Sequence, residues 1–312
     1  MRSLDTNKMS TCIFCHQNSS LSKSVEHIVP ESLGNKHHFL PRGYVCDACN
    51  HYFAVKIEQN LLTHPYFVSM RFRNEILNKK GKRVKERMLF PPFPEPVEVI
   101  LQIKDGVIDV SFDNDELYEQ IKAKNIKKMI GLYIAEPEYP NKIISRFLAK
   151  CAYEYFLYNV GEKNYDACIK ELLGPENDKL KSLREYARYG KGEYWQYTQR
   201  RIASEGDLVY NTEENIIYER LHQMTFFIKE HEQLLNGSVL AEIYFVMDIA
   251  GIEYTICISD PDISGYKQWL CEHKSQSPLD DEREKKFPIS LSNINPLLIQ
   301  TNADKKNIDY EG

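Results

Sequence analysis

Two short cysteine motifs decide the fold of this chain: CIFC at residues 12–15 and CDAC at residues 46–49. Two residues between paired cysteines let both sulfurs face one ion, and two such pairs supply the four thiolates of a tetrahedral zinc site. Four buried free thiols are the alternative, but they would not account for the paired spacing. We therefore predict a structural zinc ion with four ligands: Cys12, Cys15, Cys46 and Cys49.

Glu26 and His27 lie between the two motifs, and Asn50 directly follows the last cysteine. Hydrolysis of a phosphodiester bond needs a base that deprotonates water and a cation that offsets developing negative charge. A neutral histidine accepts a proton near neutral pH, so His27 is the candidate base. Glu26 and Asn50 offer oxygens, which suit Mg²⁺ or Mn²⁺ better than zinc. Because successive strand residues point to opposite faces, Glu26 and His27 can act together only if the backbone bends there.

The combined run of CxxC, EHIVPESLG at residues 26–34 and CxxCN resembles the zinc-knuckle branch of the HNH (ββα-metal) endonucleases. The resemblance covers about residues 10–62. It implies a β-hairpin followed by a helix, with Glu26 as a metal ligand and His27 as the general base. Asn50, at the start of the helix, would be the second protein ligand of the catalytic ion.

This chain differs from the family pattern at the middle residue of that pattern. It would lie within residues 40–42, which read Leu-Pro-Arg and include neither Asn nor His. Asn35, His37 and His38 are close in sequence, but we expect them in the hairpin loop. The departure leaves open which residue supports the predicted base.

Each of the three candidate catalytic residues has a simpler interpretation. Glu26 could be a solvated charge, His27 a hydrogen-bonded core histidine, and Asn50 a helix cap, since Asn is favoured at that position. Their occurrence together between two cysteine motifs favours a nuclease over an inert zinc module.

The residues after Asn50 predict a helix that packs on the hairpin. Phe53, Ile57 and Leu61 recur at four-residue spacing and form one apolar stripe. Glu58 lies off that stripe, where a solvated carboxylate is favoured over one that orients a metal ligand.

Length and composition set the expectations for the whole chain. With 312 residues and 42% hydrophobic content, we expect a small metal module and a larger domain with a real core. The net charge of -5 argues against a generic nucleic-acid coating protein, so any DNA contact must be local. The sequence shows neither a secretory segment nor a membrane span, which predicts a cytoplasmic protein. Four further cysteines are expected to be buried thiols: Cys151, Cys168, Cys257 and Cys271.

Positive charge concentrates between residues 71 and 87. A phosphate backbone rewards such density through counterion release, which predicts a nucleic-acid contact beside the metal module. A solvated basic face is an equally good explanation. The candidate nucleic-acid-binding residues are Arg71, Arg73, Lys79, Lys80, Lys82, Arg83, Lys85 and Arg87.

A proline cluster, FPPFPEP at residues 90–96, suggests a domain boundary. The predicted fold class is α+β, in three parts. Residues 1–62 form the HNH zinc-knuckle module, residues 63–96 a basic segment and proline-rich linker, and residues 97–312 an α+β accessory domain for sensing, targeting or partner docking.

Periodicity predicts the elements of the accessory domain. They are a hairpin at residues 97–112, helices at 115–129, 143–159 and 165–173, and an antiparallel meander at 221–258. Lys150 and Glu154 are spaced to form a weak surface salt bridge. Aromatic residues and arginines interleave in residues 184–201, where a core stripe is favoured over a base-stacking surface.

Taken with the resemblance, these features predict a metal-dependent endonuclease that hydrolyses DNA. Its C-terminal domain is expected to regulate or target the nuclease. Similar fusions belong to bacterial anti-phage defence and mobile elements. The expected partners are double-stranded DNA, a second copy of the chain for double-strand cutting, and a protein or small ligand at the C-terminal domain, with no membrane. The alternative is a non-catalytic, zinc-stabilised nucleic-acid-binding or adaptor protein.

Overall fold

The computed structural model of the chain describes residues 11–104, 107–126, 128–131, 134–172, 180–205, 207–211, 216–219, 221–233, 239–280 and 284–287. Its contacts separate two compact units. Unit 1 comprises Met1–Ile28, Leu40–His51 and Lys142–Gly312, and unit 2 comprises Val29–Phe39 and Tyr52–Asn141. None of the helices within the described ranges combines the length and apolar content that a membrane crossing requires.

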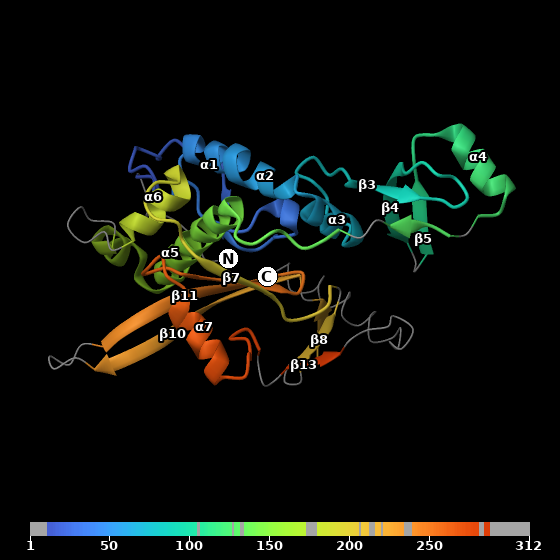
Figure 1. Ribbon diagram of the computed structural model, residues 1–312. Coiled ribbons are helices and arrows are strands. Elements are labelled where there is room, and N and C mark those ends of the chain that lie inside the picture. The colour runs from blue at the N-terminus through green and yellow to red at the C-terminus, as the bar shows by residue number, and fades with distance from the viewer. Residues whose placement is uncertain are drawn as a thin grey trace. The chain divides into compact units, whose positions relative to one another are not determined.

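The first elements build the expected hairpin and helix, and Figure 1 labels the helices α1 and α2. They are the two-stranded sheet of β1 (Glu26–His27) and β2 (Phe39–Leu40), the short helix η1 (Glu31–Leu33), α1 (Asp47–Phe53), the π-helical turn η2 (Ala54–Glu58) and α2 (Gln59–Leu62). Phe53, Ile57 and Leu61 are buried, as their spacing predicts. Glu58 is buried as well, so the prediction of a solvated carboxylate is wrong.

Unit 2 also contains an antiparallel sheet in the order β5-β4-β3-β6. Its elements are α3 (Pro65–Arg73), β3 (Lys85–Leu89), β4 (Val97–Lys104), β5 (Val107–Ser111), α4 (Asp115–Ala123) and β6 (Ile130–Gly131). The hairpin predicted at residues 97–112 is confirmed by the pairing of β4 with β5, although its turn at residues 105–106 lies outside the described residues. Helix α4 ends at Ala123, before the predicted end at residue 129.

The remaining elements of unit 1 follow residue 141. They are α5 (Lys142–Leu172), α6 (Lys181–Tyr189), β7 (Tyr197–Arg201), β8 (Leu208–Asn211), β9 (Ile216–Glu219), β10 (His222–Gln233), β11 (Val239–Ile249), β12 (Ile252–Cys257), α7 (Ser264–Glu272) and β13 (Glu284–Phe287). The helices predicted at 143–159 and 165–173 are one continuous helix, α5. The predicted meander is confirmed by the antiparallel pairing of β10, β11 and β12.

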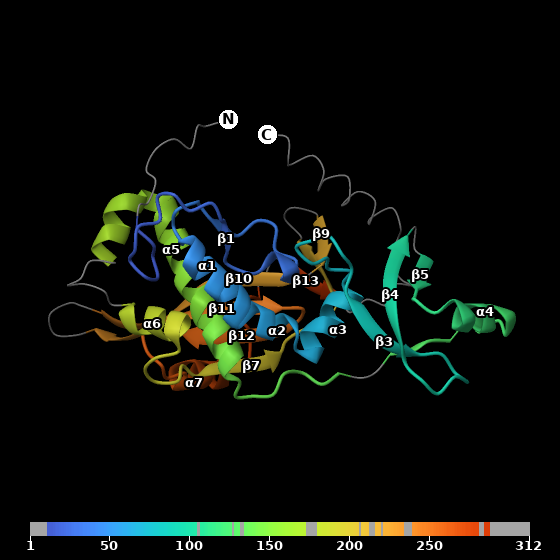
Figure 2. The same cartoon turned by 90° about the horizontal axis from the view of Figure 1, so that it is seen from above.

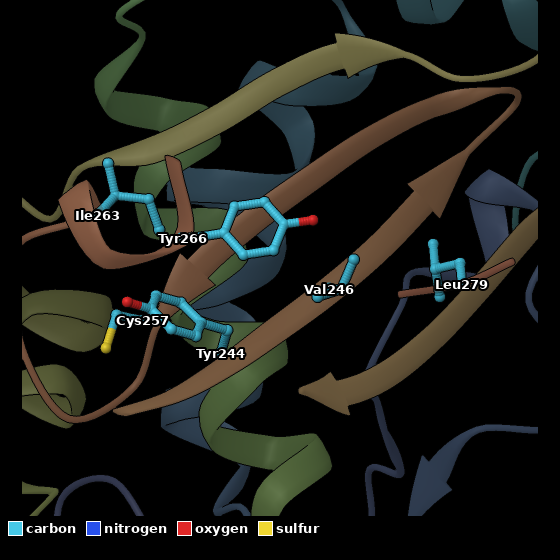
Figure 3. Packing of buried hydrophobic residues seen from close by; sticks show 6 residues of the cluster. All are labelled: Tyr244, Val246, Cys257, Ile263, Tyr266 and Leu279. Atoms are coloured by element: carbon cyan, nitrogen blue, oxygen red, sulfur yellow. The ribbon is translucent and has the colours of Figure 1, made fainter. Parts of the chain in front are cut away.

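The sheet β10-β11-β12-β7 is covered by α5 on one side and α7 on the other (Figures 1 and 2). The Tyr155 ring of α5 lies 5.2 Å from the ring of Phe226, and Trp269 of α7 lies 4.4 Å from the next residue, Phe227. Adjacent strand residues thus pack against different helices, as the two-residue period of a strand requires. Figure 3 shows the buried cluster on the α7 side, around Tyr244 and Tyr266.

Burial on both faces explains why every residue of β12 is buried. The same packing buries Tyr186, Trp195 and Tyr197, which agrees with a core role for the aromatic stretch at residues 184–201. Cys151 and Cys257 are buried as predicted, whereas Cys271, on α7, is exposed because it lies away from the sheet-facing side of that helix. The side chain of Cys168 lies outside the described residues.

The boundaries of the two compact units do not coincide with those of the three predicted parts. Unit 1 joins the cysteine motifs to residues after 141, while the segment from Tyr52 to Asn141 belongs to unit 2. The physical reason is α5, which packs against the cysteine segment: the Tyr153 hydroxyl donates to the carbonyl of Ile13 at 2.9 Å. The boundaries at residues 62 and 96 therefore remain a prediction about separately folding parts.

Candidate zinc centre and nuclease site

The four cysteines of the two CxxC motifs converge on one point. Their Sγ atoms all lie within 4.8 Å of one another, and those of Cys15 and Cys46 are 3.6 Å apart. Sulfurs about 2.3 Å from a tetrahedral zinc ion would be about 3.8 Å apart, so the spacing suits zinc. Two backbone N–H groups also point at the sulfurs: Cys46 donates to Cys12 Sγ at 3.3 Å, and Cys49 donates to Cys46 Sγ at 3.4 Å. The cluster therefore fits a structural zinc ion.

The close approach of the thiols also changes their protonation. A hydrogen bond from the Cys49 side chain lowers the pKa of Cys12 to about 4, and its partnership with Cys12 raises the pKa of Cys49. Burial raises the pKa of Cys15 to about 11. Because the pKa of Cys12 is lowered and that of Cys49 is raised, one thiol of the pair is ionised while the other keeps its proton. A cation bound by the thiolates would replace that proton.

Arg188, on α6, adds a positive charge to the cysteine cluster. Its Nε donates to Cys49 Sγ at 3.2 Å. The end of α6 is held in turn by Arg146 of α5, whose Nη2 donates to the carbonyls of Ala187 and Arg188 at 3.0 and 3.1 Å. Four thiolates around a divalent ion carry an excess of two negative charges, so a hydrogen-bonded guanidinium stabilises the ligand set.

Glu26 lies in the interior beside α5. Its side chain is 3% exposed, and its Oε1 accepts from Lys150 Nζ at 2.7 Å. Lys150 also pairs with Glu154 Oε2 at 3.1 Å, and both of these side chains are fully buried. The predicted salt bridge between Lys150 and Glu154 therefore forms, but its expected place on the surface is wrong, because this side of α5 faces β1 and not solvent. The simpler interpretation of Glu26 as a solvated charge is excluded too.

The backbone at His27 is fixed by α5 as well. Lys150 Nζ donates to the carbonyls of His27 and Ile28 at 2.9 and 3.4 Å, and Cys151 Sγ donates to Ile28 at 3.0 Å. β1 ends at His27, and the chain bends at the next two residues. The His27 side chain is half-buried, in contrast to Glu26. The bend follows both residues, so Glu26 and His27 themselves keep strand geometry, and their joint action stays a prediction.

Asn50 is brought to β1 by helix α1. It is the fourth residue of that helix, and its backbone N–H donates to Cys46 at 3.0 Å, so it is not the helix cap. Its Nδ2 donates to the carbonyl of Val25 at 3.1 Å, one residue before Glu26. The predicted second ligand thus lies beside the strand that carries Glu26 and His27.

Asn35 organises the hairpin loop. Its side chain is fully buried, and its Nδ2 donates to the carbonyls of Val29 and His38 at 2.6 and 2.8 Å. Its Oδ1 accepts from the backbone N–H groups of His37 and His38, both at 3.0 Å. Leu40, within the segment where the family pattern has its middle residue, is also fully buried. Asn35 therefore supports the loop after the predicted base, from a position that family spacing does not indicate.

The candidate nucleic-acid-binding residues have different environments. Arg71 is buried, and burial lowers the pKa of its guanidinium. Arg83 pairs with Glu75 at 2.5 Å, and Lys85 pairs with Asp113 at 2.9 Å. The exposed members of the set are Arg73, Lys79, Lys80, Lys82, Lys85 and Arg87. The role of the segment in binding nucleic acid stays a prediction, and its exposed lysines are the members best placed for it.

The sequence analysis gave no role in the site to two residues of this region: Lys150 and Arg188. Neither belongs to a motif. The sequence nevertheless indicated that Lys150 is buried, because the segment FLAKCAYEYF at residues 147–156 is apolar around most of the helix. A helix that is apolar all round is buried, and its few charged residues are then buried with it.

The HNH endonuclease family matches residues 12–66, from the first cysteine to the start of α3. No curated protein and no solved structure is significantly similar to the chain. The match covers both cysteine motifs and all three predicted catalytic residues, Glu26, His27 and Asn50. The N-terminal part of this chain is therefore an HNH module with a four-cysteine cluster, and the remainder forms a larger mixed domain of helices and sheets.

Proposed function

We propose that this protein is a metal-dependent endonuclease that hydrolyses phosphodiester bonds of DNA. The observation that carries the proposal is the contact between Asn50 Nδ2 and the Val25 carbonyl at 3.1 Å. It brings an amide from α1 to the strand that bears a carboxylate and a histidine, next to a cysteine cluster that can hold both segments in register. An inert zinc module would have no need for that convergence.

In this proposal His27 is the general base, and its half-buried ring takes a proton from the attacking water. Glu26 and Asn50 supply oxygens, the donor chemistry that suits Mg²⁺ or Mn²⁺. A carboxylate offers acceptor sites on two oxygens, so the pairing of Glu26 Oε1 with Lys150 is compatible with a metal bond. When bound, the divalent ion would offset the charge that builds on the phosphate. Zinc on the cysteines keeps the hairpin and α1 in register and takes no part in the chemistry.

The substrate and biological setting extend the same proposal. The match to HNH endonucleases supports DNA as the substrate, and the exposed lysines between residues 79 and 82 would contact its backbone. One such module would nick a single strand, so double-strand cutting would need two copies of the chain. The part after residue 141 would regulate or target the nuclease, in anti-phage defence or in a mobile element.

The test is cleavage of supercoiled plasmid by the purified full chain with Mg²⁺ or Mn²⁺. Wild type is compared with His27→Ala at equal zinc content, and His273→Ala, which removes an exposed histidine from the end of α7, is the matched control. Loss of a general base costs about 10²- to 10⁴-fold in rate. We expect that loss for His27→Ala alone.

Equal cutting by wild type and His27→Ala would contradict the assignment of the base. If wild type binds DNA after chelation of divalent ions but never cuts it, the non-catalytic binding or adaptor protein is the better description.

A further inference from the structure

Lys150 occupies an unusual position for a lysine. Its side chain is fully buried, and its ammonium lies 2.7 Å from Glu26 Oε1, 3.1 Å from Glu154 Oε2 and 2.9 Å from the His27 carbonyl. An ammonium has three N–H donors, so contacts in this number can engage all of them. A lysine held in this way is a fixed positive charge, because any other rotamer would leave it unpaired in the interior.

The ammonium contacts both residues of β1 by different means. It fixes the side chain of Glu26 and, through the carbonyls of His27 and Ile28, the peptide that follows His27. The orientation of that peptide sets the direction in which the His27 ring leaves the backbone. Cys151 strengthens the hold by donating to the Ile28 carbonyl at 3.0 Å. One turn of α5 therefore holds the Glu26 carboxylate and the backbone that carries the His27 ring.

A second ion pair of unit 1 serves as a comparison. Glu253 pairs with Arg200 through bonds of 2.6 and 2.9 Å, and Tyr266 donates to Glu253 at 2.9 Å. The cluster at Lys150 differs because its ammonium also holds the backbone of β1, the strand that carries Glu26 and His27.

We propose that Lys150 is a positioning residue of the nuclease site, which fixes the Glu26 carboxylate and the His27 backbone, so that the HNH module is completed by helix α5. The inference rests on the proposed function, because it names a residue that serves the same reaction. It assigns a role in the reaction to a residue outside residues 12–66, the segment that matches the HNH family.

The test uses the full chain and a charge-balanced double variant, Lys150→Met with Glu154→Gln. The pair of changes removes one charge of each sign, so the net charge of the cluster is unchanged while Glu26 loses its ammonium. The matched control is Arg200→Met with Glu253→Gln, which removes another ion pair of unit 1 and one charge of each sign. Lys150→Arg is the conservative variant. Zinc content, thermal unfolding, Mn²⁺ binding by electron paramagnetic resonance and plasmid cleavage at saturating Mn²⁺ are measured for each.

We expect the Lys150 double variant to keep its zinc and to bind Mn²⁺ at least as tightly as wild type, because no ammonium competes at Glu26. Its cleavage rate should nevertheless fall about 10- to 100-fold, the usual cost of removing a group that orients a metal ligand. Lys150→Arg should restore part of the rate. The control should unfold at a lower temperature and still cleave at the wild-type rate where it is folded.

Cleavage by the Lys150 double variant at or above the wild-type rate would overturn the inference, since Lys150 would then be neutral or restraining. An equal loss of cleavage in the Arg200 control would also overturn it, because the cause would be general destabilisation. If wild type itself cuts no plasmid with either ion, the proposed nuclease function fails first, and that failure is separate from any difference between the variants.

Discussion

The cysteine cluster and the Glu26 cluster lie in the same unit, but the chain assembles them in opposite ways. All four ligands of the cysteine cluster come from residues 12–49 and were evident from their spacing. The Glu26 cluster takes its cation from Lys150, on a helix that begins at residue 142. A centre made of local ligands can thus be inferred from a motif, whereas one made of a buried ion pair needs the packing of the whole unit.

Both clusters also receive a cation from helices that follow residue 141, but they depend on it differently. Arg188 donates to Cys49, one of four ligands that zinc itself can hold together. Lys150 offsets the charge of Glu26, and a carboxylate buried without a partner is strongly destabilising. We therefore expect the zinc centre to tolerate the loss of its cation and the Glu26 cluster not to.

The largest expected effect is the loss of zinc. Cys46→Ser replaces a thiolate with a poor ligand, and structural zinc contributes about 10–16 kcal/mol to the folding of small zinc domains. Zinc should fall from one ion per chain to less than half, and the Tm should drop by more than about 10 °C. Cys271→Ser, at the exposed cysteine outside the cluster, is the control and should match wild type in both measurements. Full zinc retention by Cys46→Ser would contradict the four-cysteine assignment.

A shortened chain tests the cysteine cluster and the Glu26 cluster independently. The fragment 1–141 keeps unit 2 and all four zinc ligands but lacks α5 and α6. It should still bind one zinc ion, measured by metal analysis, while cleavage falls at least about 10²-fold because Glu26 and His27 are no longer held in position. It should also unfold at a lower temperature, since the contact between Tyr153 and Ile13 is lost. A fragment that cleaves at the full-chain rate would show that the HNH module works without α5.

The smallest effect should follow from Arg188→Ala. The hydrogen bond to Cys49 disappears, and loss of such a partner lowers metal affinity about 10- to 100-fold. Zinc affinity measured by competition with a chelator should fall within that range while the protein remains folded at saturating zinc. Arg188→Lys keeps the charge but not the guanidinium geometry, so its zinc affinity should lie in between. Unchanged zinc affinity in Arg188→Ala would leave the arginine with a packing role alone.

Much of the fold followed from local patterns. The apolar stripe of Phe53, Ile57 and Leu61, the hairpin of β4 and β5 and the meander of β10 to β12 are all as predicted. These predictions succeed because apolar side chains that share a buried face recur with the period of the helix or strand that carries them. The errors share one cause. Glu58 and the pair of Lys150 and Glu154 were expected in solvent because they are charged, and each is buried.

The sequence by itself determined the zinc ligands and the identity of the candidate catalytic residues, because both lie within motifs whose spacing carries the chemistry. Only the tertiary structure decided how Glu26 is compensated and how the backbone at His27 is held. Those features depend on contacts between residues more than a hundred positions apart, such as Lys150 with Glu26. No local spacing encodes such a contact, because the packing of the whole unit determines which charged face of a helix is buried.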